Sequence, residues 1–171
     1  MNPEALYRIS YGLYIVSSQN SERPNGQIAN TVFQVTSEPV MVAVCLNRSN
    51  LTSTCVRESG VFSVSVLEKD TPMEFIGRFG FRSGRDIDKF QGIDYFIGKT
   101  GAPVVREHAV AYIEAELRDM MDVGSHTLFV GEVVDAEVLK DADVMTYSYY
   151  HYVLKGKAPK TATVYLENLK K

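Results

Sequence analysis

The sequence predicts a mainly β domain, a closed or nearly closed antiparallel barrel with a few short helices. Six segments carry strand patterns, whereas helical patterns are few and short. The alternation of strands and helices that builds a doubly wound parallel sheet is absent. Because an open sheet would expose its edges, closure is the expected arrangement. The predicted strands span residues 12–18, 29–36, 40–46, 61–67, 110–117 and 126–139.

The clearest strand signals are the alternating ones. In the segment 61–67 apolar residues alternate with serines, and in 110–117 they alternate with glutamates. This period of two is typical of strands with one buried face. Gly131 lies inside the last predicted strand, where it indicates a bulge or a bend.

Two short helices are also predicted. Residues 50–59 carry apolar residues at helical spacing, and Gly60 stands where a C-terminal cap belongs. The run from Thr71 to Glu74 has the form of a capping box with Pro72 at the first helical position. The apolar face of the second helix would consist of Phe75, Ile76 and Phe79.

Composition indicates one globular domain over residues 1–171, with a C-terminal extension from about residue 155. The formal net charge of -3 argues against a nucleic-acid partner, which needs a basic face. The chain starts without a signal-peptide core, and the longest apolar run, Val40–Leu46, is too short to cross a bilayer. We therefore expect a cytoplasmic protein without membrane contact. The only cysteines, Cys45 and Cys55, have no metal-site or redox spacing, so neither a disulfide nor a bound metal is predicted.

The usual glycine-rich phosphate loops, zinc-protease helix and nucleophile elbow are absent. A phosphate-binding protein of this sequence would need other groups, and the segment 46–60 offers one set. There a strand leads into a helix whose start combines free N–H groups, hydroxyls and the guanidinium of Arg48. The alternative is that Ser49 or Asn50 is simply the N-cap of this helix.

The stretch RFGFRSGRDIDKF, residues 78–90, offers a second set. It places a hydroxyl, a glycine and two cations around one turn, namely Ser83, Gly84, Arg85 and Lys89. These groups suit a phosphate dianion. The alternative is a solvated loop with ion pairs to Asp86 and Asp88.

Taken in order, six stretches resemble one known family. They are YRISYGLYIVSS, NGQIANTVFQVTSEPVMVAVCLN, NRSNLTSTCVRESGVFSVSVL, RFGFRSGRDIDKF, GSHTLFVGEVVDAEVL and YYHYVLKGKAPKTATVY. The chain is similar to the flavin reductase-like family of FMN-binding split β-barrels, and most closely to its small ferric reductases and flavoredoxins. The resemblance implies a Greek-key split β-barrel and a homodimer with FMN near the dimer interface. It also implies that NADH or NADPH reduces this FMN.

The resemblance further assigns cofactor-binding residues. Along the flavin ring it places Asn30, Thr31, Val32, Phe33 and Gln34. Around the ring and the ribityl chain it places Cys45, Leu46 and Asn47. The FMN phosphate would be bound by Arg48, Ser49, Asn50, Thr52, Ser83, Gly84, Arg85 and Lys89.

His126 and Cys45 are the residues to which the resemblance gives catalytic roles. The corresponding histidine of the family approaches the flavin, so His126 would orient the nicotinamide or bind an acceptor. Cys45 would face the flavin, and the two side chains together would form a weak, open site for a ferric complex. Without the resemblance, a lone histidine is usually structural and a buried cysteine is a small hydrophobe.

The resulting hypothesis is an enzyme, an FMN-dependent NAD(P)H oxidoreductase. It would pass electrons from a nicotinamide cofactor through FMN to a small-molecule acceptor, either a ferric chelate or free flavin. The alternative is a flavoredoxin-like FMN electron carrier that exchanges electrons with a separate rubredoxin or flavodiiron protein. In both, the cofactor carries the chemistry, so no general acid or nucleophile is required.

Overall fold

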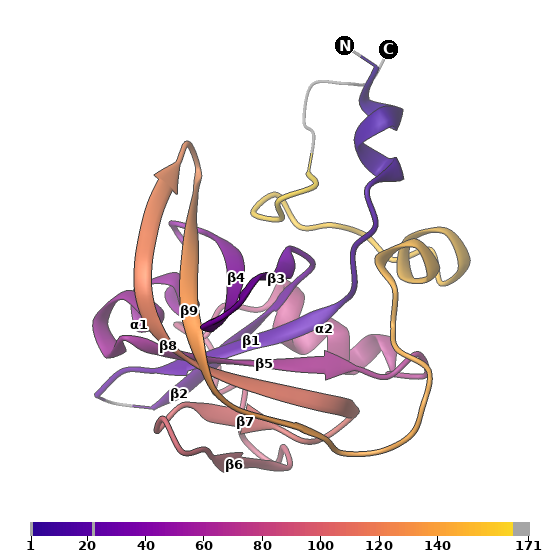
Figure 1. The fold of residues 1–171 in the computed structure, drawn as a ribbon. Helices are drawn as coiled ribbons and strands as arrows, with labels where there is room; N and C mark the ends of the chain where they lie inside the picture. The colour runs from indigo at the N-terminus through magenta and orange to yellow at the C-terminus, as the bar shows by residue number, and fades with distance from the viewer. Residues whose placement is uncertain (1, 22, 166–171) are drawn as a thin grey trace.

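The computed structural model describes residues 2–21 and 23–165 (Figure 1). The strands in this part of the chain are β1 (Tyr14–Gln19), β2 (Pro24–Ala29), β3 (Val32–Ser37), β4 (Val40–Asn47), β5 (Val61–Leu67), β6 (Tyr95–Ile97), β7 (Pro103–Val105), β8 (Ala109–Val123) and β9 (His126–Val138). The helices are η1 (Pro3–Arg8, a 3₁₀ helix), α1 (Leu51–Ser59), α2 (Met73–Phe81) and η2 (Tyr149–Val153, a π-helix). Within the described residues, no helix combines the length and the apolar character needed to cross a membrane.

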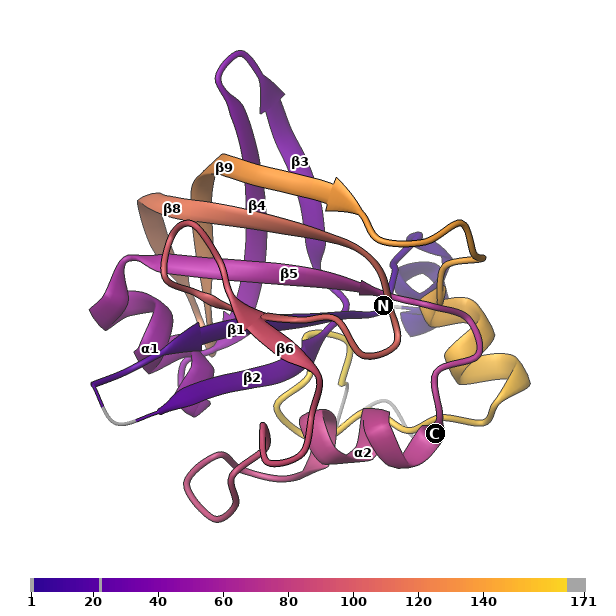
Figure 2. The same cartoon turned by 90° about the horizontal axis from the view of Figure 1, so that it is seen from below.

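Seven strands form one antiparallel sheet in the order β2-β1-β5-β8-β9-β4-β3. Its edge strands, β2 and β3, are separated in the chain only by Asn30 and Thr31. Because this link spans at most about 11 Å, the sheet must curl until its edges approach, as Figures 1 and 2 show. The predicted mainly β, nearly closed barrel is therefore confirmed. The strands β4 and β5 follow one another in the chain but lie on either side of β8 and β9, a connection of the Greek-key type.

The prediction of a single strand over residues 29–36 was wrong. The chain ends β2 at Ala29 and begins β3 at Val32, on opposite edges of the sheet. An alternating pattern indicates which side chains are buried but not which strand lies beside them. The sequence therefore does not show that the chain passes from one edge of the sheet to the other between Ala29 and Val32. β2 was not predicted, because Pro24-Asn25-Gly26 has the composition of a turn.

The other predicted strands are confirmed, and β8 and β9 extend into a long hairpin (orange, left in Figure 1). The irregularity expected at Gly131 lies opposite it on β8, where the register shifts between Leu117 and Asp119. Gly131 instead allows close packing, since a Cβ at this position would lie 2.6 Å from the ring of Phe62.

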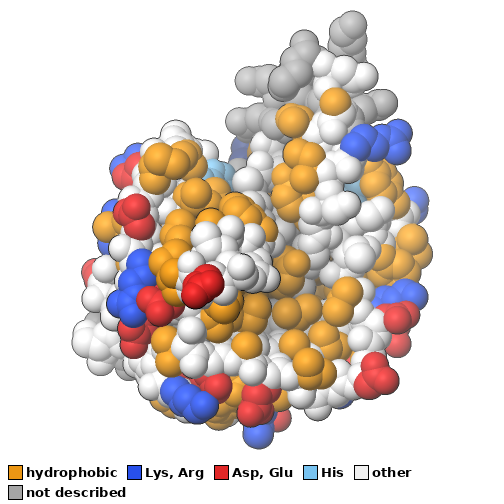
Figure 3. Space-filling view, in the orientation of Figure 1, with side chains coloured by type: hydrophobic (Ala, Val, Ile, Leu, Met, Phe, Trp, Pro, Cys, Tyr) orange, Lys and Arg blue, Asp and Glu red, His pale blue; other side chains and the backbone are white. Residues whose placement is uncertain are grey.

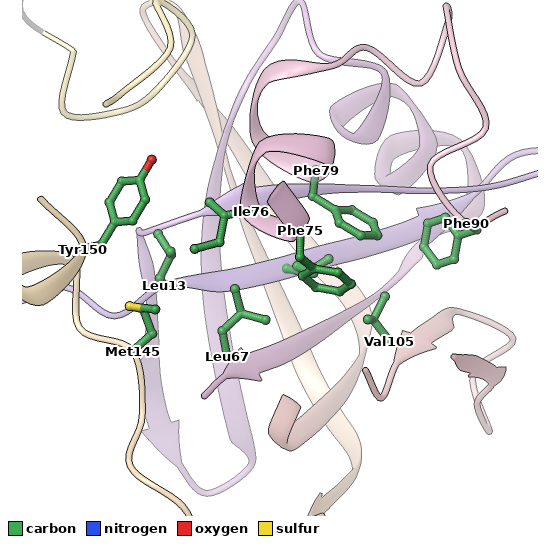
Figure 4. Close-up of a cluster of buried hydrophobic side chains, with 10 residues drawn as sticks. Leu13, Leu67, Phe75, Ile76, Phe79, Phe90, Val105, Met145 and Tyr150 are labelled. Carbon is green, nitrogen blue, oxygen red and sulfur yellow. The ribbon is translucent and has the colours of Figure 1, made fainter. Parts of the chain in front are cut away.

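Two hydrophobic clusters lie on opposite faces of the sheet. The inner cluster fills the barrel around Phe62 and Phe129. The outer cluster packs α2 against β1 and the chain around Met145 and Tyr150 (Figure 4). Strand β1 contributes to both, because successive side chains of a strand point to opposite faces. The outer cluster fixes α2 beside β2 and thereby builds one side of the cleft described below.

The helix ends match the predictions only in part. Gly60 is the left-handed C-cap of α1, with φ 71°, and its N–H donates to Val56 O. The capping box predicted for α2 was wrong, because Pro72 occupies the N-cap position. The Thr71 hydroxyl donates to Glu68 O at 2.6 Å, which closes the turn after β5 and leaves this side chain unavailable to the helix.

Candidate functional site

A cleft of about 1060 Å³, its open mouth included, lies on the outer side of the barrel. Its walls are β2, the start of α1, the loop 82–85 after α2, and the C-terminal segment 157–164. The floor is apolar and includes Leu13, Ile28, Ile76 and Phe79.

The charges around this cleft have one sign. No Asp or Glu lines it within the described residues, and its charged side chains are Arg82, Arg85, Lys89 and Lys157. The chain as a whole has a formal net charge of -3. A concentration of positive charge at one place on an acidic protein favours an anionic ligand.

Lys89 is the buried member of this set, with 4% of its surface exposed. Its Nζ donates to the carbonyls of Gly26 and Phe79, both at 2.9 Å. Neither acceptor carries a charge, and burial lowers the pKa of Lys89 to about 8. An anion in the cleft would stabilise the protonated form of this amine.

The first predicted phosphate segment lies only partly in the cleft, to which it contributes Asn47, Asn50 and Thr52. Asn50 has the backbone of an N-cap, but its side chain caps nothing. Its Nδ2 instead donates to Gln27 Oε1 at 3.1 Å. The Ser49 hydroxyl lies outside the cleft lining and donates to Asn47 Oδ1 at 2.8 Å. Asn50 is therefore the N-cap residue of α1 by its backbone conformation, but its side chain does not cap the helix.

Arg48 points away from the cleft, toward the tip of the β8–β9 hairpin. Its guanidinium lies 3.7 Å from the carboxylate of Asp122 and 3.5 Å from Gly124 O. A phosphate contact by Arg48, as predicted, would require the guanidinium to leave both partners.

All the predicted residues of the second segment line the cleft, namely Ser83, Gly84, Arg85 and Lys89. The guanidinium of Arg85 donates to Ser49 O at 3.1 Å and so links this loop to the start of α1. Across the described chain neither Asp86 nor Asp88 forms an ion pair. The alternative of a loop closed by its own ion pairs is therefore not the arrangement observed.

Asn30 and Cys45 line the cleft farther along β2 and β4. Asn30 is 6% exposed, and its Nδ2 has no hydrogen-bond acceptor within the described part of the protein. A buried donor of this kind is costly unless a ligand accepts from it. Burial raises the pKa of the Cys45 thiol, so the thiol is neutral near pH 7.

The remaining residues predicted along the ring lie outside the cleft lining. Leu46 is fully buried inside the barrel, because β4 directs it inward and directs Cys45 and Asn47 to the cleft. The chain leaves the cleft after Asn30, and 50% of Phe33 is exposed on the barrel surface. The others are Thr31, Val32 and Gln34.

His126 stands beside the cleft rather than in its lining. It is paired with Asn47 across β4 and β9, so its side chain lies on the face that carries Cys45. Its Nε2 lies 3.2 Å from Thr161 O, which belongs to the C-terminal segment. No group of three His, Cys, Asp or Glu side chains in the described residues could hold a metal ion.

Sequence reasoning missed two parts of the cleft. One is β2, which contributes Asn25 and Gln27; its polar residues at a period of two were the available signal. The other is the C-terminal segment with Tyr147 and Tyr150. The Tyr150 hydroxyl donates to Lys157 O at 2.8 Å. Burial, together with neighbouring tyrosines, raises the pKa of Tyr147 to about 12, so its hydroxyl stays neutral.

Comparison with known proteins defines the class. The flavin reductase like domain matches residues 6–156, and the chain belongs to this family. A ferric-chelate reductase (NAD(P)H) from Archaeoglobus fulgidus is 64% identical over 168 residues, which cover 98% of this chain and 99% of that protein. A high molecular weight rubredoxin from Moorella thermoacetica is 46% identical over 165 residues, 96% of this chain and 72% of that protein.

A solved structure shares the fold. An FMN-binding protein from Thermus thermophilus aligns with a TM-score of 0.71 at 27% identity, over 77% of this chain and 72% of that one. The resemblance inferred from the six sequence stretches is therefore confirmed at the level of family and fold.

Proposed function

We propose that this protein is an FMN-dependent NAD(P)H oxidoreductase that passes electrons through bound FMN to a ferric chelate or free flavin. The observation that carries the proposal is the cleft, which has an unpaired donor at Asn30 and a cationic loop at residues 82–85. Asn25, on β2, and Asn30, just past the end of β2, are five residues apart, or about 16 Å in extended chain. An elongated ligand with a polar ring edge and an anionic tail fits this arrangement. The ferric-chelate reductase at 64% identity supports the same activity.

The phosphate would lie between the loop 82–85 and the start of α1. Arg85 supplies a charge-assisted donor, and Ser83 and Thr52 supply hydroxyls at the same end of the cleft. Lys89 contributes positive charge from its buried position in the cleft wall, since both of its observed partners are neutral carbonyls.

The flavin ring would lie toward Asn30 and Cys45. Asn30 Nδ2 would donate to the polar edge of the ring, and the neutral Cys45 thiol would pack against it. Bound flavin supplies the acceptance of hydride from nicotinamide and the release of electrons singly or in pairs. His126 and the C-terminal segment would exclude water at the mouth and orient the nicotinamide, because Nε2 contacts Thr161 O there.

A homodimer is part of the proposal. Exposed apolar side chains gather on the β3–β4 and β8–β9 hairpins (Figure 3), and β3–β4 projects from the barrel (Figure 2). An apolar edge strand is normally covered by another surface. Residues 31–34, which lie outside the cleft of their own chain, would then contact the flavin of the second copy. The exposed residues are Phe33, Val35, Val40, Met120, Met121 and Val123.

One observation favours a second candidate function, an FMN electron carrier that serves a separate rubredoxin or flavodiiron protein. The relative from Moorella thermoacetica is named a high molecular weight rubredoxin, and this chain matches 72% of its length. The carrier would use the same cleft but would not turn over NADH or NADPH.

An anaerobic visible spectrum of the protein with FMN, followed by NADH, NADPH and a ferric chelate, tests the proposal. We expect one nucleotide to bleach the flavin band and the ferric chelate to restore it. Bleaching by dithionite alone would favour the carrier. A protein that leaves the spectrum of added FMN unchanged and quenches none of its fluorescence would contradict both.

A further inference from the structure

We propose that Arg23, Asn25 and Gln27 act together as positioning residues that set the spacing of the phosphate end of the cleft. These three side chains are called the β2 clamp. The inference rests on the proposed function, because it names the residues that make the same site selective for a phosphorylated flavin.

Asn25 and Gln27 are two apart on β2, so their side chains leave this strand on the same face, and Arg23 directly precedes the strand. Each binds a different part of the opposite walls. The Arg23 guanidinium donates to Gly84 O, in the loop after α2. Gln27 Oε1 accepts from Asn50 Nδ2 at 3.1 Å, at the start of α1.

Asn25 is the centre of the clamp and is 3% exposed. The groups around it assign its amide so that Oδ1 accepts from Thr52 N–H at 3.1 Å and from the Thr52 hydroxyl at 2.7 Å. Thr52 N–H is in the first turn of α1 and has no partner within the helix. The Asn25 side chain, on β2, therefore caps the start of α1, a role that the Asn50 side chain does not fill.

Gly84 makes this contact possible. A Cβ on Gly84 would lie 1.9 Å from the amide of Asn25, so any larger residue would push the loop and β2 apart. The hydrogen bond from Arg85 to Ser49 O also links the loop directly to the start of α1. Each of the two proposed phosphate-binding segments has local hydrogen bonds of its own, and the contacts with Arg23, Asn25 and Gln27 set how far apart the two segments lie.

The clamp positions rather than binds. Asn25 uses its carbonyl oxygen on Thr52, and Gln27 uses its own on Asn50. The clamp controls the distance between Arg85 and the start of α1. A phosphate group must contact both of them, whereas a flavin without phosphate need not. Loosening the clamp should therefore reduce affinity for FMN much more than affinity for riboflavin.

The experiment titrates FMN and riboflavin into wild type and Asn25→Ala, followed by quenching of flavin fluorescence. Hydrogen exchange is measured on the same proteins without flavin. We expect the variant to lose tenfold or more in FMN affinity and less than twofold in riboflavin affinity. Exchange should rise at residues 51–53 and 83–85 and stay unchanged in β8 and β9. Equal losses for the two flavins, or wild-type exchange at both segments, would overturn the proposal.

Ser65→Ala is the matched control, because Ser65 is also fully buried, lies outside the cleft lining and has an unpaired hydroxyl. It should leave both affinities unchanged. If Asn25→Ala does not fold, Gln27→Ala with Arg23→Ala tests the same claim from the half-buried ends of the clamp. If wild type binds neither flavin, the proposed function fails, and hydrogen exchange alone decides whether the clamp exists.

Discussion

The two ends of the cleft are built differently. At the phosphate end, β2, the start of α1 and the loop 82–85 are joined by side-chain bonds from Arg23, Asn25, Gln27 and Arg85. At the end where we propose the flavin ring, Asn30 Nδ2 has no hydrogen-bond acceptor within the described residues, and no side chain of β3 lines the cleft. One chain therefore completes the phosphate end but leaves the ring end open.

This difference indicates which contacts each end of the cleft needs in order to bind flavin. The phosphate end needs only the correct folding of one chain, since all of its partners lie within it. The ring end is bordered by the exposed β3–β4 hairpin and by the C-terminal segment that contacts His126. Substitutions at the first end should act on phosphate affinity, and those at the second on assembly and electron transfer.

The largest effect is expected for Arg85→Ala, which removes a charge-assisted donor from the proposed phosphate site. We expect a loss of about 10- to 100-fold in FMN affinity, measured by fluorescence quenching. Arg48→Ala is the control, because its guanidinium faces Asp122 and Gly124 instead. It should change FMN affinity less than threefold, and a larger loss for Arg48→Ala than for Arg85→Ala would reverse our placement of the phosphate.

Val35→Glu should break the assembly at the ring end. Val35 is 45% exposed on β3, and a carboxylate buried in an apolar interface is strongly unfavourable. We expect the dimer to dissociate at least tenfold more readily in sedimentation velocity, with a smaller loss of FMN affinity. Val138→Glu, at a site that is 79% exposed near the other end of β9, should leave the dimer intact. A wild type that sediments as a monomer would remove the dimer from the proposal.

The sequence predicted those parts of the molecule whose burial repeats locally. Strand β5 has its apolar residues at a period of two, so its limits were predicted correctly. Strand β2 was missed because Asn25, Gly26 and Gln27 have the composition of a turn. In the folded chain they pair with β1, and Asn25 and Gln27 bond to Thr52 and Asn50, which are distant in sequence and invisible to a local pattern.

The same limit applies to the candidate site. The loop at Arg85 was predicted because charge and glycine are visible in composition, and it lines the cleft. Arg48 has the same chemistry but is drawn to Asp122, 74 residues along the chain. The C-terminal segment reaches the cleft only because the outer cluster places Tyr150 beside it. Residue type was predictable here, whereas orientation depended on the folded chain.

Lys89 should make the phosphate end sensitive to pH. Its pKa of about 8 lies below the ordinary value of about 10.4. Between these values the unfolded chain binds more protons, so the flavin-free protein should become more stable as the pH rises from 8. FMN binding has the opposite sign, because the phosphate favours protonated Lys89, and its affinity should fall up to about tenfold from pH 8 to 9.

Titration of FMN across pH 7–9, in parallel with denaturant unfolding of the flavin-free protein, measures both slopes. The phosphate remains a dianion throughout, since its second pKa is about 6. Lys89→Met should flatten both slopes. A wild-type affinity that is constant over this range would mean that Lys89 does not sense the phosphate.

The smallest change in binding is expected for His126→Ala, at the open end. The imidazole contacts Thr161 O and lies on the face that carries Cys45, but it does not line the cleft. We expect FMN affinity to change less than about threefold, because the one hydrogen bond lost to the C-terminal segment is made to Thr161 O and His126 itself does not line the cleft. Reduction by NADH or NADPH, or reoxidation by a ferric chelate, should slow several-fold in anaerobic stopped-flow measurements, since the C-terminal segment loses its hydrogen bond to β9.

His108→Ala, where the ring pairs with Glu68 away from the cleft, is the control for loss of an imidazole. Wild-type rates in both half-reactions would leave His126 with a purely structural role and move the control of electron transfer to the other groups at the ring end, Asn30 and Cys45.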